Sequence, residues 1–329
     1  MSRLPDPVRP LGEEEAGRAF DAIMEGACAD SEIAAFLLGL AGRGETAAEI
    51  AGAARALRAR MLSVSAPEGT IDVCGTGGDG SHSLNVSTAV AFVVAGAGVP
   101  VAKHGNRGAS SRSGTADVLE ALGWRADLPF ERVEACLAET GITFLFAQRH
   151  HPAMARVAAV RRALGVRTIF NLLGPLANPA GVRRQMVGVP APAWGAPMAE
   201  AALALGAEAV LTVHGAGLDE IAVHAPSTLW MGEGAAVREA GFDPQAHGLG
   251  PHPRAAIAGG TPADNAAALR ALLEGRGSAA YRDIVLANAA GALLVAGVAP
   301  DMDEGVTLAR ASLESGAAAD RLARFLAFG

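Results

Sequence analysis

The sequence predicts an α/β protein, with a small all-helical N-terminal domain and a larger α/β domain in which helices flank a mainly parallel sheet. Helical periodicity without any strand pattern runs through residues 1–68, and from Thr70 onward short apolar runs alternate with helical segments. Helical connections between strands favour parallel pairing with right-handed crossovers. We therefore expect a helical domain over 1–68, joined by helices from about 150–180, and an α/β domain over 69–329.

Three helices are expected in the N-terminal domain. An acidic run at 13–15 opens the first, where negative charge suits the positive end of the helix dipole. Ser31 is the expected N-cap of the second, and Thr46 with Glu49 has the spacing of a capping box for the third. Apolar residues recur at helical spacing, namely Phe20, Ile23, Met24 and Ala27 in the first helix and Ile33, Phe36, Leu37 and Leu40 in the second.

The α/β domain should contain five strands, at 71–74, 99–102, 142–146, 186–189 and 210–213. The stretch 152–164 is expected to form one helix, because its apolar residues fall on a single face. Residues 171–179 are rich in turn-forming residues and are expected to be a connector or hinge. The C-terminal stretch 264–328 is expected to be mainly helical.

Composition narrows the class of ligand. A net charge of −7 argues against a general polyanion-binding surface, and 4% aromatic residues leave few platforms for stacking bases. The cysteines Cys28, Cys74 and Cys136 are odd in number and lack metal-ligand spacing, which favours a reducing cytoplasm. No apolar run approaches the roughly 18 residues of a membrane span. We expect a cytoplasmic protein that binds a small phosphorylated metabolite, not nucleic acid or a membrane.

Two polar, glycine-rich loops follow the first two expected strands. The loop at 75–80 precedes a helix that should start near 85–88, an arrangement that presents backbone N–H groups and a positive helix end to an anion. It matches neither the Walker pattern nor the dinucleotide-binding fingerprint. The loop at 103–111 is dense in polar and charged side chains. Because both loops lie at the carboxyl edge of a parallel sheet, they predict a ligand with two phosphate groups.

Lys103 is the only lysine in the chain, among 27 lysines and arginines together. A compact ammonium approaches a phosphate oxygen where a planar guanidinium needs more room, so we assign Lys103 to phosphate binding, with a solvated surface lysine as the alternative. The pair Asp219 and Glu220 follows the last expected strand. Adjacent carboxylates beside phosphate loops suit Mg²⁺, which binds one or two carboxylates plus substrate phosphates. A solvated acidic turn is the alternative for this pair.

Four segments together resemble anthranilate phosphoribosyltransferases: GTGGDGSHSLNVST at 75–88, KHGNRGASSRSGTAD at 103–117, HHPAMARVAAVRRALGVRTIFNLLGPLANP at 150–179, and the pair Asp219 and Glu220. The resemblance covers essentially the whole chain. It implies an enzyme that transfers phosphoribosyl from 5-phosphoribosyl 1-pyrophosphate (PRPP) to the amino group of anthranilate, in tryptophan biosynthesis. It also implies two Mg²⁺ ions per subunit and a homodimer formed through the helical domain.

The resemblance assigns two sets of residues to PRPP and its metal. Mg²⁺ would be held by Ser87, Asp219 and Glu220. Lys103 and the bound Mg²⁺ would stabilise the transition state, and no side chain would act as a nucleophile. PRPP would be held by the two loops and the start of the following helix, at Gly75, Gly78, Asp79, Ser83, Asn85, Val86, Ser87, Thr88, Lys103, His104, Gly105, Asn106, Arg107, Gly108, Ala109, Ser110, Ser111 and Thr115.

A third set of residues would bind anthranilate. Arg161 suits its carboxylate by bidentate pairing, whereas the neighbouring Arg162 is the better candidate for an ordinary surface arginine. The resemblance places the substrate against Gly75, Asn106 and Arg161, with His104 and His151 nearby.

Some residues depart from the family pattern, and two other functions remain open. Ser83, Leu84, Gly108 and Thr115 differ from the usual residues, but none of these changes removes a charged or metal-binding group. One alternative is an enzyme like the pyrimidine nucleoside phosphorylases, which share this fold and use inorganic phosphate. The other is a non-enzymatic, nucleic-acid-binding relative, which the net charge of −7 disfavours.

Overall fold

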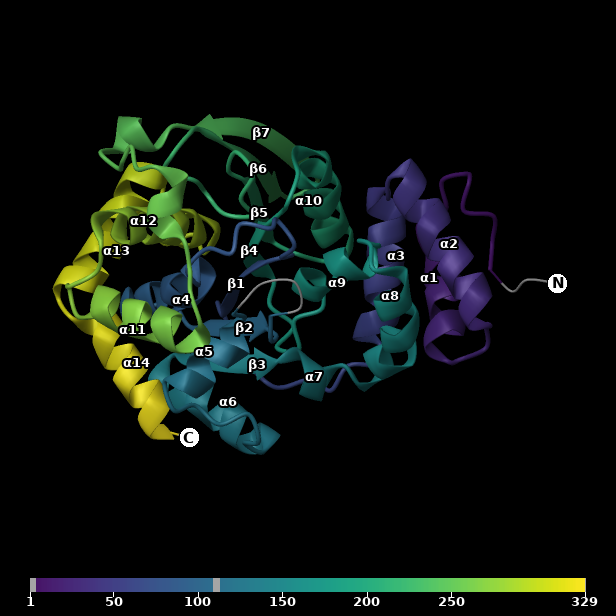
Figure 1. The fold of residues 1–329 in the computed structure, drawn as a ribbon, viewed down its shortest axis with the longest axis horizontal. Helices are drawn as coiled ribbons and strands as arrows, with labels where there is room; N and C mark the ends of the chain where they lie inside the picture. Colours follow the sequence, from purple (N-terminus) through teal and green to yellow (C-terminus); the bar gives the residue numbers. More distant parts are fainter. Residues whose placement is uncertain (1–3, 109–112, 329) are drawn as a thin grey trace.

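The computed structural model describes residues 4–108 and 113–328. A group of N-terminal helices lies beside a larger part built on one sheet, and α9 (Phe170–Leu176) and α10 (Gly195–Ala204) lie between the two (Figure 1). The small helical domain and the α/β domain with a mainly parallel sheet, both predicted from the sequence, are therefore confirmed.

The N-terminal helices are α1 (Glu13–Met24), α2 (Asp30–Arg43) and α3 (Ala47–Arg58). One apolar core holds them together, and Phe20 and Leu37 are fully buried in it. The predicted capping box of α3 is confirmed: Thr46 Oγ1 accepts the amide of Glu49 at 3.3 Å, and the Glu49 carboxylate accepts the amide of Thr46 at 2.8 Å. These reciprocal bonds pair two N–H groups that the helix itself leaves free.

The prediction that Ser31 caps α2 is wrong. The helix begins at Asp30 with Ala29 as its N-cap, and Ser31 lies in the first turn. Glu32 supplies the cap instead, because its carboxylate accepts the amide of Ala29 at 3.0 Å. Acidic side chains in the first turn also suit the positive end of the helix dipole, so the helix starts two residues earlier than predicted.

The stretch 152–164 is not one continuous helix, which corrects the prediction. A 3-10 helix spans Pro152–Val157, and α8 (Ala158–Leu164) follows it. Met154 and Val157 are three residues apart, and 3-10 geometry stacks side chains of that spacing on one face. Val157 and Val160 are buried where this segment packs against α1 and α2.

Residues 171–179 are mainly helical, although the sequence predicts a connector. The helix α9 spans Phe170–Leu176 with Pro175 inside it, and the chain leaves the helix at Ala177. Leu172 and Leu173 are buried, and α9 contacts both α3 and β2. Tertiary burial of these apolar side chains outweighs the local turn preference of the sequence.

The sheet has the strand order β3-β2-β1-β4-β5-β6-β7. The five predicted strands are confirmed and are parallel: β1 (Ile71–Gly75), β2 (Val101–Gly105), β3 (Ile142–Phe146), β4 (Arg184–Gly188) and β5 (Ala209–His214). An antiparallel hairpin of β6 (Ser227–Glu233) and β7 (Ala236–Phe242) extends one edge and is absent from the strands predicted above. Most of β7 is exposed and carries charged residues, so it lacks the apolar run that marks the other strands.

Helices cover both faces of the sheet. Met186 of β4 packs in one core with α4 (Val86–Gly96) and α12 (Ala279–Val295), and the next residue, Val187, packs in the other core with α10. The predicted C-terminal helices are confirmed as α11 (Pro262–Leu273), α12, α13 (Met302–Glu314) and α14 (Ala317–Phe328). None of the helices in the described ranges is long and apolar enough to span a bilayer. The remaining elements are α5 (Thr115–Ala121), α6 (Phe130–Thr140), α7 (Ala147–His150) and 3-10 turns at Pro192–Trp194, Pro244–His247 and Arg254–Ile257.

The strand order reverses direction between β1 and β4, which are neighbours in the sheet. At such a switch point the connections that leave the carboxyl ends of the strands separate, and α/β proteins bind ligands in the gap. The two glycine-rich loops leave the sheet at this edge, after β1 and after β2.

Candidate active site

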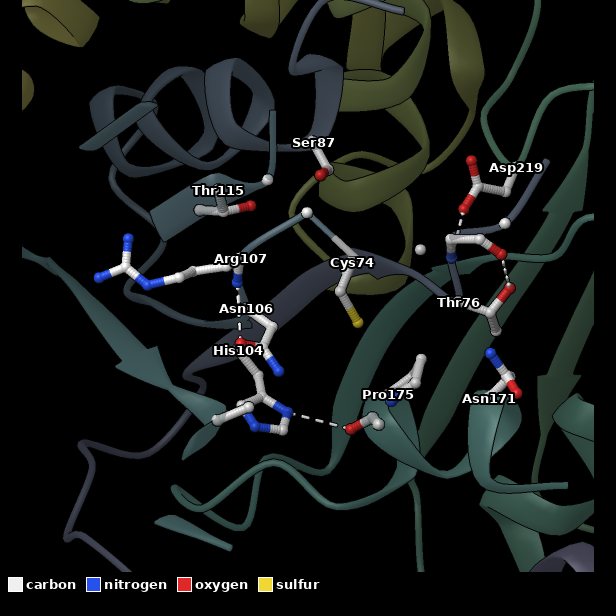
Figure 2. A pocket seen from close by; sticks show the side chains of 18 of the residues that line it. Cys74, Thr76, Ser87, His104, Asn106, Arg107, Thr115, Asn171, Pro175 and Asp219 are labelled. Carbon is white, nitrogen blue, oxygen red and sulfur yellow. Dashed lines mark hydrogen bonds between the residues drawn. The ribbon is translucent and has the colours of Figure 1, made fainter. Parts of the chain in front are cut away.

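A cavity of about 430 Å³ opens at the carboxyl ends of β1 and β2. Its walls come from both glycine-rich loops, from α9 and from the turn after β5 that carries Asp219. Figure 2 shows Thr76 and Asp219 on one side of this space, His104 and Asn106 on the other, and Cys74 between them. Segments that are far apart in the sequence therefore meet around one cavity.

Nearly all of the predicted site residues that the structure describes line this cavity; the exception is Thr88. Thr88 is buried in α4, where its hydroxyl donates to Thr115 Oγ1 at 3.2 Å, so it braces a residue that does line the cavity. Ala109, Ser110 and Ser111 lie outside the described residues.

The loop after β1 depends on glycine. Gly77, Gly78 and Gly80 have φ values of +68°, +78° and +68°, a region that side chains disfavour. A Cβ on Gly75 would lie 2.3 Å from Oδ2 of Asp219, so that position also requires glycine. Turns of this kind expose successive backbone N–H groups, which suit phosphate oxygens.

Three carboxylates gather beside this loop. Asp219 and Glu220 are adjacent, and Oδ2 of Asp79 accepts the amide of Asp219 at 3.4 Å. Burial, followed by the charge of Asp79, raises the pKa of Asp219 to about 7. Burial, followed by the charge of Asp219, raises the pKa of Glu220 well above its usual range. A cation would relieve the repulsion between these carboxylates, which adds to the effect of burial on both pKa values.

The oxygen donors of this cluster fit Mg²⁺. The Ser87 backbone donates to Glu220, and the Ser87 hydroxyl lies 3.2 Å from the ammonium of Lys103. Within residues 4–108 and 113–328, no three His, Cys, Asp or Glu side chains converge in a geometry that would hold a metal. A Mg²⁺ ion here would therefore take its other ligands from phosphate oxygens and water, as this ion commonly does.

Lys103 is buried, with 3% of its surface exposed, so the alternative of a solvated surface lysine is wrong. Its ammonium donates to the carbonyl oxygen of Val73 at 2.7 Å and to Ser87 Oγ at 3.2 Å. Burial raises the pKa of the nearby Asp72, and the positive charge of Lys103 opposes that shift. Lys103 therefore brings a buried positive charge to the wall of the cavity.

His104 and His151 form a hydrogen-bonded pair in the wall of the cavity, with their Nε2 atoms 3.2 Å apart. The carbonyl oxygen of Gly174 lies 3.0 Å from Nδ1 of His104 and can only accept, so Nδ1 carries the proton. Nε2 of His104 then accepts from Nε2 of His151. Burial is the main cause that lowers the pKa of His104 to about 3 and that of His151 to about 4, so both rings are neutral near pH 7.

The two predicted arginines of the cavity wall are held differently. The guanidinium of Arg161, on α8, lies 5.7 Å from the ring centroid of Phe170, and burial lowers its pKa with no described carboxylate opposing. Arg107 instead forms ion pairs with Asp117 at 3.2 Å and Glu120 at 2.5 Å on α5. Arg161 is thus free to pair with a ligand carboxylate, whereas Arg107 is already paired.

Several residues that shape the cavity were missed by sequence reasoning. Asn171 and Pro175 of α9 line it, in the segment that was interpreted as a connector. Asn288 of α12 holds the turn after Glu220, because its side chain accepts the amide of Ile221 at 2.8 Å and donates to the carbonyl of Ile221 at 2.9 Å. Asn171, a polar residue in a turn-rich segment, was a signal that the sequence offered for this site. Asn288 gave no such signal, because it is an isolated asparagine within a long apolar helix.

Comparison with known proteins identifies the family. Residues 5–61 match the helical bundle domain of a glycosyl transferase family, and residues 68–319 match its a/b domain. An anthranilate phosphoribosyltransferase from Novosphingobium aromaticivorans is 55% identical, covering 97% of this chain and 96% of that protein.

Solved structures agree. The anthranilate phosphoribosyltransferase of Thermus thermophilus is 44% identical with a TM-score of 0.92, covering 98% of this chain and 99% of that chain. The Saccharomyces cerevisiae enzyme has been solved with PRPP and Mg (28% identical, TM-score 0.87) and with 4-fluoroanthranilate (27%, 0.86), each covering 97% of this chain and 93% of the other. The chain therefore belongs to the anthranilate phosphoribosyltransferase family.

Proposed function

We propose that this protein transfers the phosphoribosyl group of PRPP to the amino group of anthranilate, giving N-(5-phosphoribosyl)anthranilate and pyrophosphate, as a step of tryptophan biosynthesis. One observation carries the proposal: a single cavity brings together two glycine-rich loops, a buried lysine and a pair of buried carboxylates. These groups would bind a diphosphate and its metal at one end of the cavity. The neutral histidines and Arg161 would bind an aromatic acid at the other end of the cavity.

Asp219, Glu220 and Ser87 would hold Mg²⁺, with two ions per subunit. The raised pKa values of both carboxyl groups support a cluster that a cation stabilises. Bound Mg²⁺ would neutralise charge on the departing pyrophosphate.

PRPP would lie along the two loops and the N-terminus of α4. Backbone N–H groups of the first loop would donate to phosphate oxygens, and Lys103 would add its charge from the floor of the sheet. The residues that would contact PRPP are those assigned above from the sequence, with Thr88 acting through Thr115.

Anthranilate would lie between α8 and the loop after β2. Arg161 would pair with its carboxylate, and Asn106 and Gly75 would border the ring. His104 and His151, both neutral near pH 7, would lie beside the bound anthranilate.

The reaction needs no nucleophilic side chain. The neutral aromatic amine attacks C1 of the ribose with its lone pair while the bond from C1 to the pyrophosphate oxygen breaks, and the amine then loses one proton. The protein orients the two substrates and stabilises the negative charge that grows on the leaving group, chiefly through Lys103 and backbone N–H groups.

We also propose a cytoplasmic homodimer with the domain division 1–68 and 69–329, in which helices from 150–180 join the first domain. Four of the five exposed large apolar residues in the described chain, Val8, Leu38, Leu62 and Val166, lie on the N-terminal helices or on segments next to them, which supports association through this part. The segment that contains α8 and α9 shares one apolar core with α1, α2 and α3. The thiols of Cys74 and Cys136 form no disulfide, which supports a reducing compartment.

Loss of anthranilate fluorescence on addition of PRPP and Mg²⁺ tests the proposed reaction. We expect the wild-type protein to consume anthranilate and the double variant Asp219→Asn, Glu220→Gln to lose nearly all activity and its dependence on Mg²⁺. Phosphate-dependent cleavage of a pyrimidine nucleoside, with no loss of anthranilate, would contradict the proposal. If the double variant kept wild-type activity and the same dependence on Mg²⁺, Asp219 and Glu220 would not bind the metal and would only form a turn.

A further inference from the structure

Arg167 lies in the connection between α8 and α9 and reaches the loop after β1 from outside the cavity. Its Nη1 donates to the carbonyl oxygen of Gly77 at 2.7 Å. The amide of the same glycine donates to Oδ2 of Asp219 at 2.8 Å. Both backbone groups of Gly77 are therefore hydrogen-bonded. Its amide donates to the Asp219 carboxylate, which is assigned to Mg²⁺, and its carbonyl accepts from the Arg167 guanidinium.

Gly78 makes this approach possible. Its φ is +78°, and a Cβ at this position would lie 2.2 Å from Nη1 of Arg167. A side chain there would meet both a disfavoured backbone conformation and the guanidinium. The glycine thus accommodates Arg167 as well as the turn.

The guanidinium is anchored away from the loop as well. The Cζ atom of Arg167 lies 5.1 Å from a ring centroid of Trp194, within the range of cation–π attraction. Nε1 of Trp194 in turn donates to the Glu45 carboxylate at 3.3 Å. Burial lowers the pKa of Arg167, and the charges of Asp219, Glu45 and Asp79 oppose that shift. Arg167 therefore sits between acids of the loop region and an acid of the helical part.

Burial of the Arg167 side chain destabilises the folded protein. Its Nε and Nη2 atoms are buried without a hydrogen-bond partner among the described residues. Unpaired buried donors destabilise a folded protein. A neutral, apolar side chain would avoid this penalty but would lose the bond to Gly77, so the arginine is better explained by what it does for the loop than by stability.

We infer that Arg167 is a positioning residue for PRPP, which fixes the carbonyl of Gly77 and through it the N–H groups of the phosphate loop. The inference rests on the proposed role of that loop in binding the diphosphate. Arg167 is not among the residues that line the cavity and acts through Gly77. Because it follows α8, it also ties the phosphate loop to the helical part that carries Arg161, so the two substrate regions share one support.

The variant Arg167→Met tests this, with Arg162→Met as the matched control on the exposed side of α8. We expect Arg167→Met to raise the KM for PRPP about tenfold, as loss of a charged hydrogen bond would, while the KM for anthranilate changes less than about twofold. Amide hydrogen exchange should accelerate in residues 75–82 but not in α12. The control variant should match the wild type in both measurements.

Equal KM values for PRPP in Arg167→Met and wild type, or equal defects for both substrates, would overturn the inference. Arg167→Lys keeps the charge and one donor, and we expect a KM for PRPP between those of wild type and Arg167→Met. If Arg167→Met fails to fold, an unchanged KM for PRPP in Arg167→Lys overturns the inference on its own. Failure of the proposed function is separate, because the wild-type protein would then not consume anthranilate at all.

Discussion

The amide nitrogen of Gly77 and Oδ2 of Asp219 are 2.8 Å apart, although 142 residues separate them in the chain. This bond joins the loop that would hold the diphosphate to the carboxylate that would hold Mg²⁺. A substitution that moves the loop should therefore also move the Asp219 carboxylate, and the reverse. Phosphate binding and metal binding should be disturbed together.

Substitution of Gly75 by alanine should disturb both. A Cβ at this position would lie 2.3 Å from Oδ2 of Asp219 and would displace the carboxylate. We expect Gly75→Ala to lower kcat/KM at least about tenfold and to raise the Mg²⁺ concentration needed for half-maximal activity. Titration of activity with Mg²⁺ measures both.

Gly42→Ala is the control for this prediction. Gly42 lies in α2 with open space around its Cβ position, so alanine there should leave activity unchanged and stabilise the protein by about 0.5 to 1 kcal/mol. An active Gly75→Ala protein with the wild-type Mg²⁺ curve would show that the Asp219 carboxylate can move without consequence.

Replacement of Lys103 should weaken PRPP binding in a way that arginine does not fully restore. The ammonium is buried and donates to the carbonyl of Val73 and to Ser87 Oγ, a site with little room for a larger planar group. We expect Lys103→Ala to raise the dissociation constant for PRPP about ten- to a hundredfold and Lys103→Arg to recover only part of this loss. Calorimetric titration with PRPP and Mg²⁺ measures the constants.

Arg18→Lys is the control, because it exchanges the same two residue types on the exposed face of α1. This variant should bind PRPP as the wild type does. Full recovery by Lys103→Arg would mean that positive charge alone matters at this position and that the shape of the ammonium does not.

Arg161 and Arg162 are neighbours with different expected roles. Arg161 lines the cavity beside Phe170, whereas Arg162 is exposed. Loss of a bidentate contact to a carboxylate costs about 1.5 to 3 kcal/mol, so Arg161→Ala should raise the KM for anthranilate by about ten- to a hundredfold and leave that for PRPP nearly unchanged. Steady-state kinetics with each substrate varied in turn measure this, and Arg162→Ala should do little. Equal effects of the two variants, or a defect confined to PRPP, would reverse the assignment.

The pair His104 and His151 should make the fold sensitive to acid. Each ring has a pKa near 6.5 when unfolded, lowered on folding to about 3 for His104 and about 4 for His151, mainly by burial. Between those values the unfolded chain binds more protons than the folded one. The free energy of unfolding therefore falls on acidification, by up to about 1.4 kcal/mol per pH unit for each histidine, and is fully regained above the unfolded pKa.

Urea unfolding between about pH 7 and about pH 5 measures this slope, and His104→Gln should reduce it because one of the two groups no longer titrates. An unchanged slope in His104→Gln would show that His104 is not held neutral in the folded protein.

The features predicted correctly from sequence are those that local signals specify. The capping box of Thr46 and Glu49 lies within four residues, and the five parallel strands are short, mainly apolar runs that the helices on both faces of the sheet largely bury. The errors arose where distant contacts decided the outcome. Residues 171–179 form most of α9 because Leu172 and Leu173 are buried, which outweighs the turn preference of the segment.

The sequence by itself determined which residue types carry the chemistry and the order in which they occur, because glycine-rich loops after strands and an isolated lysine are visible without coordinates. Only the tertiary structure decided their protonation and their partners. The pKa of Asp219 depends on burial and on Asp79, and that of His104 on burial and on His151, residues brought close by the fold. Arg167 meets Gly77 across 90 residues of chain, a contact no local pattern records, because hydrogen bonds and desolvation depend on distance in space and not on separation in sequence.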